Sequence, residues 1–345
     1  MIGQSREQRK ERSEGPGLGE VLRLLGSENF ARFSGIYVIG LFILIFSIWV
    51  PDTFLTVTTL KSVLGDQAIT LVLALGLLIP LAAGQFDLSV AQNLGLGAMI
   101  CAVLQVKTGL GWVEAALITM ACGAAIGAIN GGLILFGVDS FIATLGMSSI
   151  LLALTSLIGN NEFVGPLSNS FQDLAIAEPF GFPIVALYAV AAAALLWWLL
   201  EHTPMGRRTY ATGANADAAR LAGVRTRRYT FLALVACGAI ASLAGVLVAA
   251  KVGQVSPTLG PPYLLPAFAA CFLGMTQIKV GRFNVLGTVI AIYLLAIGSK
   301  GLQLAGGELW VTEMFNGVAL VGAVTIAVLG ARRRNSRLKA ETERA

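Results

Sequence analysis

The stretch HTPMGRRTYATGANADAARLAGVRTRRY, residues 202 to 229, decides how this chain is organised. It is the one long polar interruption in an apolar sequence that runs from about residue 33 to residue 329. The interruption carries six arginines and a single acidic residue, Asp217. It therefore predicts a polar loop that divides a series of membrane-spanning segments.

This loop contains the start and stop signals of a short helix. Asn215 is a good N-cap, Asp217 lies in the first turn, and Gly223 suits the position just after the helix end. About seven helical residues lie between them, fewer than the ~12–15 that an isolated helix needs in water. The apolar side of this helix consists of Ala218, Leu221 and Ala222. The helix must therefore dock, either on the protein's own membrane face or on a partner in the cytosol.

The composition of the whole chain predicts a membrane protein. Hydrophobic residues fill 56% of the 345 positions, charged residues only 12%, and the mean hydropathy is +0.78. Soluble domains contain about 25% charged residues. The net charge of +5 does not indicate nucleic-acid binding, because the basic residues gather at the ends of apolar segments. The single histidine, His202, excludes a histidine-based metal or catalytic site, and the four cysteines form no C-x-x-C pair.

Ten apolar segments each approach the ~20 residues that a ~30 Å hydrocarbon core requires. They predict an all-α integral membrane protein with about ten transmembrane helices. We place these at about 33–50, 64–83, 88–106, 112–136, 141–160, 183–201, 230–251, 264–279, 284–304 and 310–330. Pro80 lies inside the second segment and predicts a kink there. The predicted domains are a tail at 1–32, a transmembrane domain at 33–330 that includes the 202–229 loop, and a basic tail at 331–345.

Basic residues predict the orientation. The 1–32 tail, the 202–229 loop and the 331–345 tail contain six Lys or Arg residues each, whereas residues 160–181 contain none and have three acidic residues. With ten spans, the three basic regions fall on one side of the membrane and residues 160–181 on the other. Because basic loops stay in the cytoplasm, both termini are predicted to be cytoplasmic.

Polar residues at membrane depth form a first group near Asp87. The run Gly84 to Ser89, followed by Gln92 and Asn93, splits one long apolar stretch and predicts a broken or capped helix. Asp87 and Ser89 are suited to cap the following helix, which would make the run a tight turn at the cytoplasmic surface. Alternatively, the broken helix lines a solute path and offers hydrogen bonds to hydroxyl groups. Both interpretations remain open.

A second polar group surrounds residues 130 to 149. Asp139 and Ser140 are suited to cap the fifth span, whereas Asn130, Thr144 and Ser148 either face a polar cavity or bond back to their own helices. The candidate path residues from both groups are Asp87, Ser89, Gln92, Asn93, Asn130, Phe141, Thr144 and Ser148. The glutamates near the outer ends of spans are interpreted as solvated surface; these are Glu114, Glu308 and Glu313.

Motifs for chemistry are absent from the sequence. It contains no G-x-x-x-x-G-K-[ST] phosphate loop and no H-E-x-x-H, and no set of Ser, His and Asp can form around one boundary histidine. We therefore expect no catalytic residues, no metal site and no ATP hydrolysis by this chain itself. An intramembrane enzyme would lack both a nucleophile–base pair and a metal.

Three motifs, in order, resemble the permease subunits of bacterial ribose-type ABC importers. That family carries a G-R-x-x-Y-A-x-G-x-N-x-x-A-A-R-x-x-G-[IV] pattern, filled here by Gly206, Arg207, Tyr210, Ala211, Gly213, Asn215, Ala218, Ala219, Arg220, Gly223 and Val224. Residues 86–90 resemble the family's G-G-I-D-L-S-V-G signature, and residues 140–146 its P-x-F-I-A-T-L-G segment. The chain departs from the family at Gln85 and Ala91, where glycines are usual, and in residues 276–288, which contain fewer glycines.

The resemblance implies a multi-pass subunit of the bacterial cytoplasmic (inner) membrane that imports a monosaccharide or similar polyol. It implies no cofactor on this chain, because ATP binds to two cytoplasmic ATPase subunits. The other implied partners are a second permease subunit, expected to be an identical chain, an extracytoplasmic sugar-binding protein and membrane lipid, with no nucleic acid.

The resemblance also assigns the 202–229 loop to ATPase coupling, with Arg220 available to an acidic ATPase residue. The implied coupling residues are Gly206, Arg207, Tyr210, Gly213, Asn215, Ala218, Ala219, Arg220 and Gly223. The alternative is an ion-coupled secondary transporter of a small polar solute. Such a transporter requires an ionisable residue deep in a span, for which Asp87 is the one serious candidate.

Overall fold

The computed structural model describes residues 28–308 and 310–325, and these residues are helical apart from turns and loops. Within those ranges the only β-type pairing is an isolated bridge between Val164 and Val255. Almost all of the two predicted tails, 1–32 and 331–345, lies outside the described residues. The expectation that both tails are cytoplasmic therefore stays a prediction.

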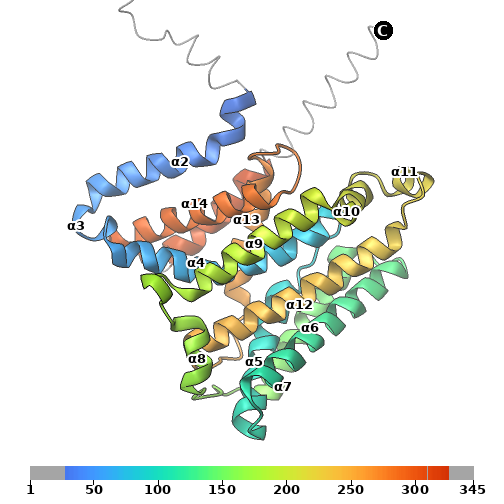
Figure 1. Ribbon diagram of the computed structural model, residues 1–345, viewed down its shortest axis with the longest axis horizontal. Coiled ribbons are helices and arrows are strands. Elements are labelled where there is room, and N and C mark those ends of the chain that lie inside the picture. The colour runs from blue at the N-terminus through green and yellow to red at the C-terminus, as the bar shows by residue number, and fades with distance from the viewer. Residues whose placement is uncertain (1–27, 309, 326–345) are drawn as a thin grey trace, which may run out of the picture.

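The described chain folds into one bundle of helices (Figure 1). The long helices are α2 (Glu28–Trp49), α4 (Val57–Ala82), α5 (Val90–Thr108), α6 (Trp112–Leu135), α7 (Ser140–Gly159), α9 (Ile184–His202), α12 (Thr226–Val252) and α14 (Val285–Leu304). The shorter elements are α3 (Pro51–Phe54), α8 (Asn169–Ile176), η1 (Pro179–Gly181), α10 (Pro204–Ala214), α11 (Ala216–Leu221), η2 (Pro261–Tyr263) and α13 (Leu264–Met275). Residues 310–325 are helical as well.

Eight of these helices are long and apolar enough to cross a membrane. They correspond to eight of the ten predicted spans, which confirms the all-α membrane class. The tenth predicted span, 310–330, is described only as far as residue 325. Pro80, the predicted kink, lies in the last turn of α4, two residues before the helix ends at Ala82.

The prediction of a full helix at 264–279 was wrong. The helix there, α13, has only 12 residues, about 18 Å of rise against a ~30 Å hydrocarbon core. Pro257, Pro261 and Pro262 precede it, together with Gly253 and Gly260. Proline removes backbone donors and glycine opens other conformations, so the chain makes only the 3-10 turn η2 before α13 begins at Leu264.

A non-helical segment and α13 together replace the missing helix. At one end, Val255 N–H and Val164 O pair at 2.9 Å and Leu167 N–H donates to Gly253 O at 2.9 Å, beside the 160–181 loop. At the other end, the turn after α13 lies next to Glu201, where the 202–229 loop begins. Since α9 joins those two loops, residues 253–275 run from one end of the bundle to the other. The two-sided arrangement of the ten-span prediction is thereby kept.

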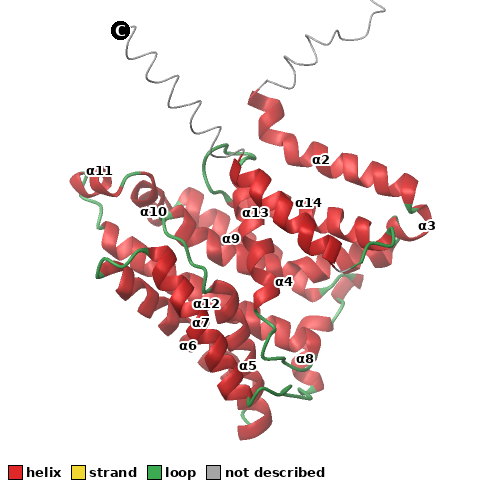
Figure 2. Cartoon of the chain, turned by 180° about the vertical axis from the view of Figure 1, so that it is seen from behind, coloured by secondary structure: helices red, strands yellow, loops and turns green. Residues whose placement is uncertain are grey.

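Helix α12 is central to the bundle and packs along α4, α5 and α6 (Figure 1). Its contact with α6 depends on glycines: a Cβ on Gly238 would lie 2.2 Å from the carbonyl oxygen of Gly123, and one on Gly127 would lie 2.2 Å from Leu234 O. These glycines therefore let the backbones of α6 and α12 meet. Helix α2 lies along one edge of the bundle, with apolar side chains such as Ile48 exposed (Figure 2).

Candidate functional site

The 202–229 loop folds into two helices rather than the single one predicted. Helix α10 begins at Pro204, with the Thr203 hydroxyl accepting from Gly206 N–H at 3.3 Å, and ends at Ala214. Thr followed by Pro is a usual helix start, so the signal for α10 was present in the sequence. Helix α11 follows immediately and projects from the bundle (Figure 1).

The predicted caps of α11 are confirmed. Asn215 Oδ1 accepts from Ala218 N–H at 3.0 Å, and Gly223 follows the helix with a left-handed φ of 83°. Gly223 N–H donates to Arg220 O and Val224 N–H to Ala219 O, the pair of bonds that defines a Schellman motif. A helix of six residues is held by these caps because its own hydrogen bonds are too few.

The apolar side of α11 is exposed to solvent. Leu221 is 89% exposed, and Ala218 and Ala222 are exposed as well, whereas Ala219 is buried. Arg220 pairs with Asp217 at 2.9 Å, but both side chains are largely exposed, so this pair contributes little to stability. The sequence left two docking modes open, on the protein's own surface or on a partner. The described chain does not cover the apolar side of α11 with its own surface.

Helix α10 faces the bundle instead. A Cβ on Gly206 would lie 2.1 Å from Leu200 O, and one on Gly213 would lie 2.3 Å from Ala82 O. These glycines let α10 touch the ends of α9 and α4 without a side chain between. The nine residues implied for coupling therefore fall into two groups. Four face the bundle or allow close contact with it: Gly206, Tyr210, Gly213 and Ala219. Five are exposed: Arg207, Asn215, Ala218, Arg220 and Gly223.

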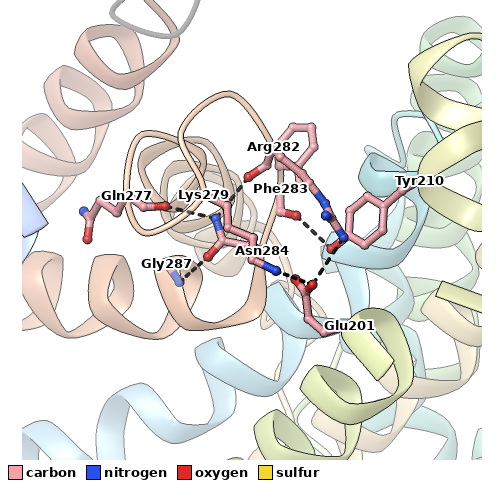
Figure 3. Close-up of polar contacts among 8 residues, drawn as sticks. All are labelled: Glu201, Tyr210, Gln277, Lys279, Arg282, Phe283, Asn284 and Gly287. Carbon is pink, nitrogen blue, oxygen red and sulfur yellow. Dashed lines mark hydrogen bonds and ion pairs between the residues drawn. The ribbon is translucent and has the colours of Figure 1, made fainter. Parts of the chain in front are cut away.

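Tyr210 connects α10 to the turn after α13 (Figure 3). Its hydroxyl donates to Phe283 O at 2.8 Å, and the Arg282 guanidinium carbon lies 3.5 Å from its ring centroid. Burial raises the pKa of the Tyr210 hydroxyl to about 12, so this group stays protonated and remains a donor. Glu201, at the end of α9, pairs with Arg282 and Lys279 of the same turn.

Asp87 and its neighbours form a buried hydrogen-bond network. Asp87 Oδ1 accepts from Ser89 N–H at 3.0 Å and from the Ser89 hydroxyl at 2.6 Å, and Asn130 Nδ2 donates to Ser89 Oγ at 2.9 Å. Leu88 N–H donates to Thr144 Oγ1 at 3.0 Å. Asp87, Ser89, Asn130 and Thr144 are all almost fully buried. Residues from the turn before α5 and from α6 and α7 are therefore held together.

Asn93 extends this network to α12. Its Nδ2 lies 3.4 Å from Gly123 O and 3.3 Å from Gly238 O, and its Oδ1 accepts from the Ser242 hydroxyl at 2.9 Å. The remaining predicted path residues lie apart from it. Gln92 is half-buried beside Gly260, Ser148 is half-buried on α7, and Phe141 is exposed.

A cavity of about 870 Å³ lies elsewhere, between α4, α14, the 256–266 segment and the 310–325 helix. Its polar lining residues are Gln67, Thr70, Ser256, Thr258, Tyr263, Ser299, Gln303, Thr312, Glu313 and Asn316. Gln303 Nε2 donates to Thr312 Oγ1 at 3.0 Å, while Gln67, Glu313 and Asn316 make no side-chain hydrogen bond within the described residues. Glu313, interpreted from the sequence as solvated surface, is exposed and also contributes to the lining of this cavity.

Comparison with known proteins assigns the chain to a family. The model of the family "Branched-chain amino acid transport system / permease component" matches residues 59–328. The chain belongs to this family. It is 31% identical to the ribose import permease of Escherichia coli (strain K12), over 79% of this chain and 86% of that protein. It is 32% identical to the ribose import permease of Bacillus subtilis (strain 168), over 84% and 90%.

Relatives with other named sugars match as well. The D-allose permease of Escherichia coli (strain K12) is 26% identical over 86% of this chain and 93% of its own length. The galactose/methyl galactoside permease of the same organism is 28% identical over 86% and 94%. No solved structure matches. The chain is thus a transport component rather than a catalytic subunit, and a multi-pass protein of the bacterial inner membrane.

The polar lining of the cavity in this permease was missed from the sequence, although part of its signal is visible there. Gln67 and Thr70 are three residues apart, and Ser299 and Gln303 are four apart, so each pair shares one helix face. Thr312 and Asn316 have the same spacing. What the sequence lacks is any sign that these faces meet, since that depends on how the 256–266 segment folds between the helices.

Proposed function

We propose that this permease carries a monosaccharide or similar polyol into the cytoplasm, driven by partner ATPase subunits. Membership of the permease family supports the transport role, and the relatives named for ribose, allose and galactose support the solute class. The sequence contains no phosphate-binding loop, so the energy comes from another subunit. ATP is bound by that partner, and this chain needs no cofactor.

The exposed apolar side of α11 is the observation that carries the coupling assignment. This helix is capped at both ends, joined directly to α10, and presents Ala218, Leu221 and Ala222 outward. Small side chains allow a partner to approach closely, and one exposed leucine provides apolar area to bury. We assign this surface to a groove of a cytoplasmic ATPase subunit, one for each of two permease chains.

The cavity is our candidate for the solute path. The amide and carboxylate groups of Gln67, Glu313 and Asn316, which have no side-chain partner within the described residues, can hydrogen-bond the hydroxyls of a sugar, and the apolar wall can hold its C–H faces. Its volume of about 870 Å³ exceeds what one monosaccharide occupies, so water or a second copy of the chain would complete it. An extracytoplasmic binding protein would deliver the sugar at the end of the bundle that carries residues 160–181.

We propose different parts for the path residues predicted from sequence. Gln92 lies beside Gly260 of the segment that walls the cavity and stays a candidate for solute contact. The other five buried path residues make hydrogen bonds to one another and to backbone groups, although Asn130 Oδ1 has no partner among the described residues; the five are Asp87, Ser89, Asn93, Asn130 and Thr144. Their proposed role is structural: they hold α5, α6, α7 and α12 together next to the 83–89 turn.

The coupling assignment is tested by Ala218→Trp, with Ala216→Trp as the matched control on the opposite side of α11. Expected results for Ala218→Trp are normal amounts in the membrane, loss of the co-purifying ATPase, and loss of ATP-driven uptake of ribose, allose or galactose. Ala216→Trp should retain the ATPase and uptake. Equal ATPase recovery with both variants would contradict the assignment.

The same uptake assay separates the ion-coupled alternative. An importer driven by ATP stops when ATP is depleted and continues when the proton gradient is collapsed. A secondary transporter does the opposite, and its ionisable residue would have to meet the solute path. Asp87, the ionisable residue that the sequence offers for this role, does not line the cavity, whereas Glu313 does, so the uptake assay decides between the two mechanisms.

A further inference from the structure

Helix α13 lies between the solute cavity and the start of the 202–229 loop. Its outer end lines the cavity through Leu265 and Pro266, directly after the prolines of η2. Its inner end leads into the turn 276–284, which packs against α9 and α10. With 12 residues and a non-helical segment before it, α13 is short enough to shift as a unit.

The turn 276–284 is held by contacts with two neighbouring helices, α9 and α10 (Figure 3). From α10, the Tyr210 ring stacks against Arg282 at 3.5 Å and its hydroxyl reaches Phe283 O. From α9, Glu201 contacts Arg282 Nη2 at 3.4 Å and also pairs with Lys279. The Glu201 side chain is 9% exposed, whereas Lys279 and Arg282 are 43% and 40% exposed, so solvent screens these pairs from one side only.

The turn itself is tied internally. Asn284 Nδ2 donates to Gly274 O, Gln277 O and Arg282 O at 3.0–3.1 Å, and Asn284 Oδ1 accepts from Gly287 N–H at 2.7 Å. A Cβ on Gly274 would lie 2.5 Å from Thr288 N, so α13 and α14 meet backbone to backbone. A displacement of Arg282 therefore moves the end of α13 as well, because the turn between them is held by its own hydrogen bonds.

We propose that Tyr210, Arg282 and Glu201 are positioning residues that carry movement of the 202–229 loop to α13, and so to the wall of the solute cavity. Movement of α10 pulls on Arg282 and Phe283 through Tyr210. Glu201 keeps Arg282 aligned over the tyrosine ring. The non-helical segment 253–263 absorbs the displacement while the long helices stay packed. This inference rests on the proposed function, because it needs an ATPase acting on the loop.

The test uses the complete importer with its ATPase and binding protein in proteoliposomes. Thr258→Cys in a chain whose native cysteines are replaced reports cavity access, through its labelling rate with a water-soluble maleimide. In this parent, trapping the ATPase with ATP should change the labelling rate. Arg282→Gln and Tyr210→Leu should each leave ATPase co-purification intact. Each should abolish the ATP-dependent labelling change and lower sugar imported per ATP about tenfold or more.

Two further variants separate coupling from simple damage. Arg227→Gln removes an arginine of the same loop that bonds Leu135 O rather than the turn, and it should behave as the parent does. Arg282→Lys keeps the charge but loses the planar stack on Tyr210, so it should recover part of the coupling. If Arg282→Gln fails to reach the membrane, Tyr210→Leu and Arg282→Lys still decide the question.

The outcomes are distinct. Parent-like labelling and parent-like import per ATP in Tyr210→Leu and Arg282→Lys would overturn the inference while leaving the proposed function intact. If the wild-type importer itself shows no ATP-dependent uptake, the proposed function fails and the inference falls with it. Loss of the labelling change with ATP hydrolysis retained supports it, since a merely structural defect would lower both.

Discussion

The helical core of this permease is interrupted in two places, and the two interruptions use polar residues in opposite ways. The first, residues 83–89, is short, and Asp87 and Ser89 make their hydrogen bonds inside the protein. The second, residues 253–284, includes the segment that walls a cavity of about 870 Å³, where Gln67, Glu313 and Asn316 have no partner among the described residues. A buried polar group that is already paired holds a fold together, whereas one facing open space can bind a solute.

The largest expected effect on stability comes from breaking the buried hydrogen-bond network, in which the polar groups are paired. Asn93→Leu leaves the Ser242 hydroxyl and two glycine carbonyls without their partner inside the bundle. The cost should be about 2–3 kcal/mol, since each lost bond buries an unsatisfied group, with smaller values usual in membranes. Detergent-solubilised protein should lose its monodisperse peak at a lower temperature than the wild type.

Asn316→Leu is the matched control for Asn93→Leu, because it removes the same amide from the cavity. It should shift the melting temperature little and reduce sugar uptake instead. If both variants unfold alike, the distinction between paired and open polar groups is wrong.

The next largest effect is expected in the cavity, where polar groups face open space. Gln303→Trp places an indole in the cavity and should lower uptake about tenfold or more by excluding the sugar, a cost above ~1.4 kcal/mol in solute binding. The melting temperature should stay near that of the wild type. Leu286→Trp, on an exposed face of the same helix α14, controls for adding bulk. Full uptake by Gln303→Trp would remove the cavity from the solute path.

The features predicted correctly from sequence depend on local rules. Asn215 and Gly223 cap α11 because an N-cap oxygen and a left-handed glycine act within four residues of their partners. The eight long helices follow from apolar length alone. The cavity was missed because it depends on assembly: it exists only where four separate segments converge. The short α13, by contrast, has a local cause in the prolines before it.

Asp87 shows the same limit at a single residue. Its identity at membrane depth suggested either a cap or a path, and the sequence could not decide between them. Asp87 is 1% exposed and bonds Ser89 in the turn before α5. Among the described residues no side chain caps the first turn of α5, so the predicted cap was wrong and the carboxylate holds the preceding turn instead.

A smaller effect is therefore expected from Asp87→Asn. The amide oxygen can still accept from Ser89, so stability should fall by about 1 kcal/mol, and uptake per folded transporter should be unchanged. Loss of uptake without loss of folded protein would instead favour direct contact between Asp87 and the solute. The comparison is made by normalising uptake to the monodisperse fraction.

The smallest effect concerns the backbone at each interruption. The first uses Gly84 at φ 78°, whereas the second uses Ile278 at φ 56°, where a β-branched side chain is strained by about 1–2 kcal/mol. Ile278→Gly relieves this strain but adds freedom to the unfolded chain, so the net gain should be about 1 kcal/mol or less. Gly84→Ala should do the reverse, since its Cβ would also lie 3.1 Å from Gly213 Cα. A small rise in melting temperature for Ile278→Gly beside a fall for Gly84→Ala is the expected result. A fall in both would mean that the Ile278 side chain contributes more by packing than its backbone conformation costs.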